Sequence, residues 1–199
     1  MVVLALWLVV GAGAAENTKT LLFFGDSLTA GYGVDPDEAY PALVQRKIDD
    51  AGQPWRVVNA GLSGETTAGG LRRLDWILRQ RVDLIVIELG GNDGLRGIDP
   101  ATTRANLVAM IERIRQRYPD VIVVLAGMQL PTNMGPDYTH AFAAIYPEVA
   151  QEERATLIPF LLDRVGGIPS LNQADGIHPT AEGHRIVAET VWHALQPLL

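Results

Sequence analysis

The segment Asp83–Leu89, DLIVIEL, is a nearly continuous apolar run that stops at Gly90-Gly91. A run of this length without strict alternation of apolar and polar residues is typical of a strand covered on both faces. Similar runs, bounded by Gly, Asp or Pro, occur at four other places in the chain. They are Thr20–Gly25, Arg56–Asn59, Val121–Ala126 and Thr156–Phe160. The sequence therefore predicts five buried strands.

Amphipathic stretches with helical spacing separate these strands. Apolar residues recur there at intervals of three or four, as they do on the buried face of a helix. A final helix is predicted to start after Pro179, a favourable first helical residue. The predicted buried positions are Leu71, Leu74 and Leu78; Leu107, Met110, Ile111 and Ile114; and Val187, Val191 and Leu195. Alternating strands and helices predict an α/β fold, with a parallel sheet between two layers of helices, formed by one domain over residues 16–199.

The composition of the 199 residues excludes several classes of protein. There is no cysteine, so the chain has no disulfide, thiolate zinc site, iron–sulfur cluster or cysteine nucleophile. The formal net charge of −7 argues against nucleic acid as the main partner, because phosphate contacts need clustered Lys and Arg. Hydrophobic residues make up 48% and charged residues 20%, which favours a folded domain over a disordered chain.

Met1–Ala15 carries no charged side chain and ends in Gly-Ala-Gly-Ala-Ala. An apolar segment that closes on small residues predicts a secretory signal peptide, and hence export to the periplasm or the medium. It is too short to span a bilayer, which needs about 20 apolar residues. The segment lacks the Lys or Arg usual near the start of a signal. The alternatives are therefore a buried first strand or a wrongly assigned start, with the protein in the cytoplasm.

Polar residues gather where the predicted strands end, which is where parallel α/β folds bind their ligands. Ser27 follows the first strand by two residues. Its hydroxyl could point into a crevice there, with its backbone N–H facing an oxyanion. The alternative for Ser27 is a helix N-cap, a position that serine favours.

Asn92 and Gly64 follow two other predicted strands. The Asn92 amide could donate a hydrogen bond to a developing oxyanion, assisted by the N–H of Gly64. Glycine at position 64 would let the backbone approach a substrate closely, because it has no Cβ. Asn92 lies in a Gly-Gly-Asn-Asp-Gly segment, however, and such residues are also common in ordinary turns.

Asp175 and His178 lie three residues apart in a short loop before the last helix. A carboxylate so placed can accept a hydrogen bond from imidazole Nδ1 and leave Nε2 free as a base. A serine nucleophile needs such a base, because its own hydroxyl is weak at neutral pH. The alternative is a surface turn with a solvated histidine. His184 and His193 lie within the last predicted helix and have no such acidic partner.

Other catalytic motifs are absent from the sequence. The segment Gly61-Leu62-Ser63-Gly64-Glu65 has Glu where the G-x-S-x-G motif needs its last glycine. There is no G-x-G-x-x-G after the first strand, no P-loop and no H-E-x-x-H. A metal site built from Asp26, Asp93, Asp175 and His178 remains an alternative, although it lacks the additional histidines that such sites recruit.

Four separate blocks of this sequence resemble those of the SGNH (GDSL-type) hydrolases. The blocks are Gly25-Asp26-Ser27, Leu62-Ser63-Gly64-Glu65-Thr66, Gly90-Gly91-Asn92-Asp93 and Asp175-Gly176-Ile177-His178. Their order along the chain makes the resemblance specific, and it extends over residues 20–199. Longer strings are similar to the bacterial branch of arylesterases and multifunctional thioesterase/lysophospholipases. These strings span residues 59–66, 88–97 and 175–179.

The resemblance implies a flavodoxin-like sandwich and hydrolysis of esters or thioesters through an acyl-enzyme. Ser27 would be the nucleophile, and His178, oriented by Asp175, would be its base. The oxyanion would be held by the backbone N–H groups of Ser27 and Gly64 and by the Asn92 amide. The resemblance implies no metal or organic cofactor.

The substrate is expected to be a small ester or thioester, lysophospholipids included, and the enzyme a monomer. Asp26 and Asp93 are expected to hold the turns by hydrogen bonds rather than to take part in the chemistry. A carbohydrate O-acetylesterase is the alternative within this fold, and a non-catalytic binding module is the alternative outside it. Residues that could line an acyl groove, or that simply pack, are Leu95, Ile98, Leu130 and Pro131.

Overall fold

The computed structural model describes residues 18–199, so the predicted signal peptide over residues 1–15 lies outside the described residues. A five-stranded sheet forms the centre of the molecule, with all its strands parallel. The strand order is β2-β1-β3-β4-β5, which is the flavodoxin-like order. The strands are β1 (Lys19–Gly25), β2 (Trp55–Asn59), β3 (Leu84–Glu88), β4 (Ile122–Ala126) and β5 (Thr156–Ile158). The predicted five-stranded parallel sheet is therefore confirmed.

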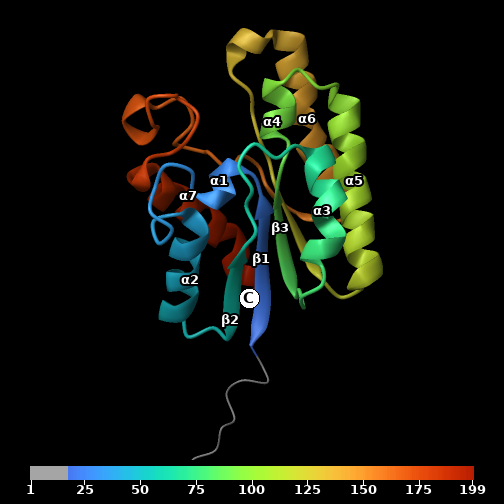
Figure 1. The fold of residues 1–199 in the computed structure, drawn as a ribbon, viewed down its shortest axis with the longest axis vertical. Helices are drawn as coiled ribbons and strands as arrows, with labels where there is room; N and C mark the ends of the chain where they lie inside the picture. The colour runs from blue at the N-terminus through green and yellow to red at the C-terminus, as the bar shows by residue number, and fades with distance from the viewer. Residues whose placement is uncertain (1–17) are drawn as a thin grey trace, which may run out of the picture.

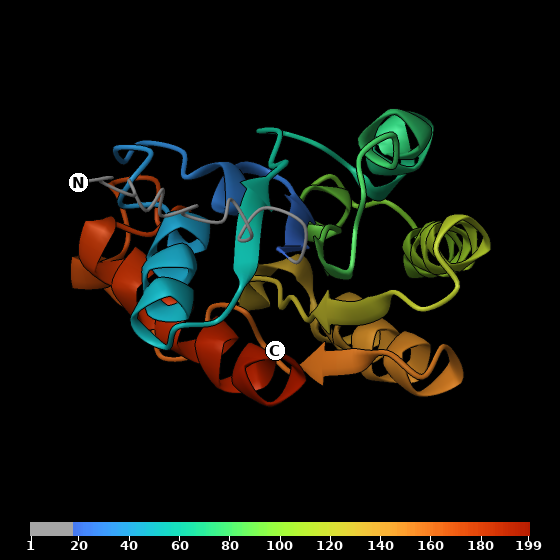
Figure 2. The same ribbon diagram turned by 90° about the horizontal axis from the view of Figure 1, so that it is seen from below.

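Five long helices cover the two faces of this sheet. They are α2 (Tyr40–Asp50), α3 (Thr67–Ile77), α5 (Pro100–Arg117), α6 (Pro136–Glu152) and α7 (Ala181–Leu195). Helices α2 and α7 pack together on one face, and α3, α5 and α6 form the layer on the other (Figures 1 and 2). The three-layer α/β/α arrangement is therefore confirmed. In the described part of the chain, no helix combines the length and the apolar character needed to cross a membrane.

The short helices lie at the carboxyl ends of the strands. They are α1 (Ser27–Ala30) and α4 (Gly91–Leu95). The 3-10 turns are Thr132–Met134, Pro169–Leu171 and Gln196–Leu198, and the last of these follows α7 near the start of β2. Figure 1 shows α1 and α4 at the same end of the sheet, beyond the carboxyl ends of β1 and β3. The segment that contains Asn92 was predicted to be a turn, and this is wrong. It is a helix of a single turn, too short for any apolar periodicity to reveal it.

Strand β1 shows why the predicted strands do not alternate between apolar and polar residues. Its residues 21–24 point alternately to the two faces of the sheet, yet all four are fully buried. Both faces are covered by helices, so every position of the strand needs an apolar side chain. At the carboxyl end of β1, Gly25 is the partner of Glu88 in β3. This register places the segments that follow the two strands side by side.

Four predicted strands differ from the observed ones by one residue at one or both ends, and two other boundaries differ for a local cause. Strand β5 ends at Ile158 instead of Phe160, because Pro159 has no N–H with which to continue the ladder. Helix α7 starts at Ala181, and its N-cap is Thr180, whose Oγ1 accepts from the N–H of Gly183 at 3.3 Å. Pro179 therefore precedes the cap and is not the first helical residue. The predicted buried positions of this helix, Val187, Val191 and Leu195, are confirmed.

His184 joins the two helices that cover one face of the sheet. It lies on α7, is 1% exposed, and its Nδ1 accepts from the backbone N–H of Tyr40, the first residue of α2, at 3.2 Å. Its ring is nearly parallel to that of Tyr40, with the centroids 6.2 Å apart. The other ring nitrogen, Nε2, is buried without a hydrogen-bond partner. Burial is the main cause that lowers the pKa of His184 from 6.5 to about 4.

Acid should weaken the fold through His184. In the unfolded chain this imidazole takes up a proton near pH 6.5, whereas in the folded protein it does so only near pH 4. The unfolded state binds more protons between these values, so the free energy of unfolding falls as the pH falls through this window. In His184→Leu this contribution is absent. The free energy of unfolding of the parent minus that of His184→Leu should therefore decrease by up to about 3 kcal/mol from pH 7 to pH 4, as measured by urea unfolding.

His193→Leu is the matched control, because His193 lies on the same helix with its side chain exposed. The difference in unfolding free energy between the parent and this variant should not change across the same pH range. A parent-minus-variant difference for His184→Leu that is equal at pH 4 and pH 7 would contradict the assignment.

Candidate active site

Ser27 is the first residue of α1, directly beyond the end of β1. The N-cap of this helix is Asp26, whose Oδ1 accepts from the N–H of Leu28 at 3.0 Å. The alternative prediction, that Ser27 is the cap, is therefore wrong. With the capping role taken by its neighbour, the Ser27 hydroxyl is left to other partners.

His178 and Asp175 form a hydrogen-bonded chain with Ser27. His178 Nε2 lies 2.9 Å from Ser27 Oγ, and His178 Nδ1 lies 2.7 Å from Asp175 Oδ2. The other carboxylate oxygen, Asp175 Oδ1, accepts from the N–H groups of Ile177 at 2.8 Å and His178 at 3.0 Å. Hydrogen bonds from the His178 backbone and ring lower the pKa of Asp175 to about 2, so this carboxylate is ionised at neutral pH. The chain can move a proton from the serine to the imidazole.

Tyr32 lies against the His178 ring and was missed in the sequence. The ring centroids are 4.6 Å apart, and the rings are tilted by 43°. The backbone oxygen of Tyr32 accepts from Gln173 Nε2 at 2.7 Å, which links this residue to the loop that carries His178. No local pattern could have indicated the contact, because the two aromatic residues are far apart in the chain.

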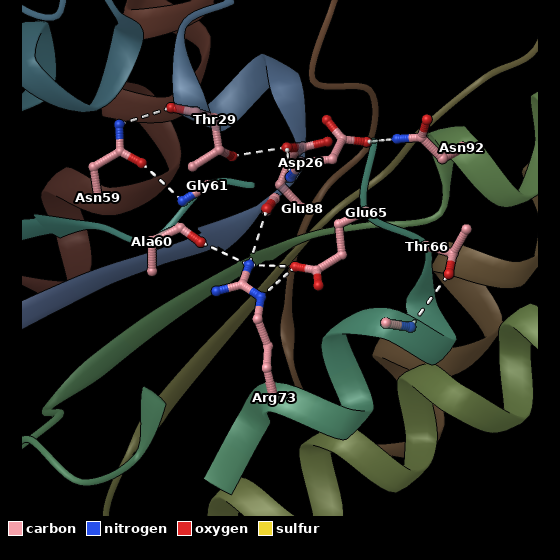
Figure 3. Close-up of polar contacts among 12 residues, drawn as sticks. Asp26, Thr29, Asn59, Ala60, Gly61, Glu65, Thr66, Arg73, Glu88 and Asn92 are labelled. Carbon is pink, nitrogen blue, oxygen red and sulfur yellow. Dashed lines mark hydrogen bonds and ion pairs between the residues drawn. The ribbon is translucent and has the colours of Figure 1, made fainter. Parts of the chain in front are cut away.

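Asn92 lies in α4, directly beyond the end of β3. Its Nδ2 donates to Asp26 Oδ2 at 2.9 Å (Figure 3). An amide nitrogen carries two hydrogens, so the second remains free for another acceptor. Asn92, Ser27 and His178 all line one cavity. The structure thus brings the amide and the hydroxyl to the same space.

Gly64 lies in the loop between β2 and α3, with a φ of +78°. A Cβ at this position would meet no atom closer than 3.8 Å, so the positive φ rather than crowding makes glycine necessary. Its carbonyl oxygen accepts from Arg96 Nη2 at 2.9 Å. The same loop is tied to the nucleophile segment, because Leu62 N donates to Gly25 O at 2.9 Å. Within residues 18–199, the N–H groups of Gly64 and Ser27 donate to no protein acceptor.

Arg73, which the sequence did not indicate as part of the site, supports the loop that carries Gly64. It extends from α3, forms an ion pair with the buried carboxylate of Glu65, and donates to Ala60 O at 2.8 Å (Figure 3). It also donates to Gly25 O at 3.4 Å, and its guanidinium lies 4.5 Å from the centre of the Phe24 ring. One half-buried cation therefore joins the end of β1, the loop after β2 and the helix that follows.

Glu88 is fully buried at the end of β3, beneath Asp26 (Figure 3). Its Oε2 accepts from Thr29 Oγ1 at 2.7 Å and from the N–H of Asp26 at 3.1 Å, while Oε1 has no partner. Burial raises the pKa of Glu88 well above its ordinary value and raises that of Asp26 to about 6. With a pKa of about 6, Asp26 is mostly ionised at neutral pH.

Asp93 points away from the cavity. It accepts from the backbone N–H of Thr67 at 2.8 Å and from Thr67 Oγ1, and so fixes the start of α3. The four residues of the alternative metal site thus have separate partners: Asp26 binds Asn92, Asp93 binds Thr67, and Asp175 binds His178. Among residues 18–199, no three His, Cys, Asp or Glu side chains are arranged to hold a metal ion.

The cavity beside Ser27 has a volume of about 610 Å³. Three of the four residues predicted for an acyl groove line it, namely Leu95, Leu130 and Pro131, whereas Ile98 does not. Ile98 instead accepts from Tyr138 Oη with its backbone oxygen at 2.7 Å. Apolar lining residues that were not predicted for the acyl groove are Leu28, Met128, Phe160, Leu162 and Ile177.

Comparison with proteins of known sequence gives relatives over nearly the whole chain. The chain is 46% identical to the esterase TesA of Pseudomonas aeruginosa over 197 residues, which cover 98% of this chain and 96% of the relative. It is 38% identical to the thioesterase 1/protease 1/lysophospholipase L1 of Escherichia coli strain K12, over 98% of this chain and 91% of the relative. An arylesterase of Vibrio mimicus is also 38% identical, over 90% of each chain.

Solved structures share the fold as well. A crystal structure of TesA matches with a TM-score of 0.87 and 47% identity, over 91% of this chain and all of that one. The psychrotrophic esterase EstA from Pseudoalteromonas, inhibited by monoethylphosphonate, matches with a TM-score of 0.85 and 31% identity, over 90% and 98% of the two chains. The sequence profile of the GDSL-like lipase/acylhydrolase family matches residues 23–186. With this match and relatives of this identity and coverage, the chain belongs to the GDSL-like lipase/acylhydrolase family.

Proposed function

We propose that this protein is a serine hydrolase of carboxylic esters that works through an acyl-enzyme on Ser27. The observation that carries the proposal is the chain from Ser27 through His178 to Asp175, with contacts of 2.9 Å and 2.7 Å. The family and the relatives named as esterase, arylesterase and thioesterase/lysophospholipase support the same chemistry. A non-catalytic binding module would need none of these contacts.

In the proposed reaction, His178 Nε2 removes the hydroxyl proton of Ser27 as Oγ attacks the acyl carbonyl carbon. The imidazolium that forms donates this proton to the leaving alcohol or thiol as its bond to the carbonyl carbon breaks. Water then attacks the acyl-enzyme with the same histidine as base, and the acid and free Ser27 are released. The ionised Asp175 holds Nδ1 protonated and so keeps Nε2 available as the acceptor.

The oxyanion is proposed to be held by the Asn92 amide and by the backbone N–H groups of Ser27 and Gly64. All three groups have a hydrogen that no described protein atom accepts. Donors fixed in place before the reaction stabilise charge that develops on the carbonyl oxygen, and this contribution belongs to the transition state. No metal or organic cofactor enters these steps.

The acyl group of the substrate is proposed to lie against Leu95, Leu130 and Pro131. Most of the side chains around the cavity are apolar, and a cavity of this kind favours a hydrocarbon group. Ile98 does not line the cavity, so we leave it out of the groove. The relatives named above, an esterase, an arylesterase and a thioesterase/lysophospholipase, favour an aryl or acyl ester or thioester over an O-acetylated sugar. Activity on p-nitrophenyl esters of increasing chain length would measure how much of the cavity the acyl group uses.

Export is proposed from the sequence of residues 1–15 alone, because these residues lie outside the described structure. The segment is apolar, uncharged and ends in small residues, and the alignment with TesA of Pseudomonas aeruginosa includes 98% of this chain. We propose that cleavage after Ala15 leaves a monomeric enzyme of 184 residues. The intact mass of protein recovered from a periplasmic extract tests the cleavage, and gel filtration tests the monomer.

A fluorophosphonate should label Ser27 and no other serine. An activated serine attacks phosphorus as it attacks a carbonyl, and the relative EstA was crystallised in a phosphonate-inhibited form. Ser27→Ala should abolish labelling and hydrolysis, while Ser63→Ala, a change in the exposed loop nearby, should preserve both. Peptide mapping of the labelled protein identifies the site. Label on Ser63 or Ser170 in stoichiometric amount, or loss of activity in EDTA, would contradict the proposal.

Asn92→Ala should lower kcat on the order of 10²–10³ and leave KM nearly unchanged, the usual effect of losing one oxyanion donor. The reason is that the amide binds the charged oxygen of the transition state more strongly than the neutral carbonyl of the substrate. Steady-state kinetics on p-nitrophenyl acetate measure the effect, with circular dichroism to check folding.

Asn106→Ala provides a control for the loss of a partly buried amide. Asn106 Nδ2 donates to Thr67 Oγ1 at 2.9 Å, and the residue does not line the cavity. Its kcat should stay within about threefold of the parent. If a folded Asn92→Ala variant behaves in the same way as this control, the oxyanion is held elsewhere.

A further inference from the structure

The carboxylate of Asp26 serves two donors from two different elements, one on each oxygen. Oδ1 accepts from the backbone N–H of Leu28, which caps α1, and Oδ2 accepts from Asn92 Nδ2, which lies on α4. The side chain is 2% exposed and shares the lining of the cavity with Ser27 and Asn92. The residue next to the nucleophile is thus in direct contact with the amide that faces the same cavity.

We propose that Asp26 is the positioning residue of the oxyanion hole, because its Oδ2 selects the orientation of the Asn92 amide. This inference rests on the proposed role of Asn92. The two ends of a side-chain amide have nearly the same shape, so its hydrogen-bond partners decide which end points where. Because Asp26 Oδ2 is an acceptor, it holds the NH₂ group of Asn92, and not the amide oxygen, on the side that faces Asp26. The second hydrogen of the same NH₂ group then points to the substrate oxygen.

Glu88 holds Asp26 in this position from beneath. It accepts the backbone N–H of Asp26 at 3.1 Å and the hydroxyl of Thr29 at 2.7 Å. A Cβ on Gly25 would lie 2.5 Å from Glu88 Oε2 and 2.1 Å from Thr29 Oγ1, so this contact exists only because Gly25 has no side chain. Burial raises the pKa of Asp26 to about 6, so its carboxylate is mostly ionised at neutral pH. A hydrogen bond to a charged acceptor is stronger than one to a neutral acceptor, which strengthens the hold on Asn92.

Asparagine cannot replace Asp26 in this arrangement. Its amide has one acceptor oxygen, whereas Leu28 N and Asn92 Nδ2 each need one. In Asp26→Asn, either the cap is lost or the Asn92 amide turns over and presents its oxygen to the oxyanion. Serine separates the two functions, because its short side chain still caps a helix but does not reach across to α4. Asp26→Ser therefore keeps the cap and removes only the contact with Asn92.

A double-mutant cycle on p-nitrophenyl acetate tests the proposal. Asp26→Asn and Asp26→Ser are each measured in the parent and in the Asn92→Ala background. In the parent we expect kcat to fall by at least about tenfold with KM within about threefold, since only the transition state needs the donor. In the Asn92→Ala background the same changes should lower kcat by less than about twofold, because no amide remains to be oriented.

Each possible result decides the question. The proposal is supported if an Asp26 substitution lowers kcat at least about fivefold more in the parent than in the Asn92→Ala background. Any smaller ratio overturns it. If Asp26→Asn does not fold, Asp26→Ser, which retains the cap, provides the same comparison. An Asn92→Ala variant with parental kcat overturns both the oxyanion role of Asn92 and this inference. A damaging Asn92→Ala with additive Asp26 variants overturns the inference alone.

Asp93→Asn is the matched control, since Asp93 is also a buried carboxylate and follows Asn92 directly in the chain. Its oxygens bind Thr67 and not the Asn92 amide. We expect a lower melting temperature with kcat within about threefold of the parent, and no coupling to Asn92→Ala. Coupling as large as that of Asp26 would overturn the specific role given to Asp26.

Discussion

The pairing of Gly25 with Glu88 at the end of the sheet is the constraint on which the site depends. Parallel strands that end in register place the segments after them side by side, so α1 and α4 start next to each other. Gly25 has to lack a side chain because the carboxylate of Glu88 and the hydroxyl of Thr29 occupy the space of its Cβ. A shift of one residue in this pairing would separate Asp26 from Asn92 and turn Glu88 to the opposite face of the sheet.

The polar groups beneath the site are costly to bury, and apart from Glu88 Oε1 their polar atoms have hydrogen-bond or ion-pair partners. The guanidinium of Arg73 faces the carboxylate of Glu65 and two backbone oxygens, while Glu88 faces a hydroxyl and a backbone N–H. Such contacts add little net stability, because charges lose their hydration when they are buried. Their effect is geometric, since they fix the loop that carries Gly64 and the cap that precedes Ser27. Rigid support of this kind is what an oxyanion hole requires.

The sequence indicated the strands, the layers and three residues that the structure brings to one cavity, Ser27, Asn92 and His178, because these depend on local signals. Apolar runs identify buried strands, and short polar blocks at their ends identify where the chain turns into a site. Helix α6 was not predicted, partly because Pro147 interrupts its pattern, and α4 has a single turn. Arg73, Tyr32 and the burial of Glu88 were missed because their partners are distant in the chain. A glutamate inside an apolar run gives no sign of its partners, and the contact of Glu88 with Thr29 of α1 becomes visible only in the structure.

The contact between Ser27 and His178 joins residues that are 151 positions apart. Closing so long a loop costs chain entropy, and that cost is repaid only when the intervening strands and helices are in place. The first strand and the last helix must therefore both be docked before the hydroxyl meets its imidazole. An unfinished or partly folded chain would carry every residue of the site and still be inert. Turnover thus reports that folding is complete, and a cell that makes this protein is not exposed to its hydrolytic activity before that point.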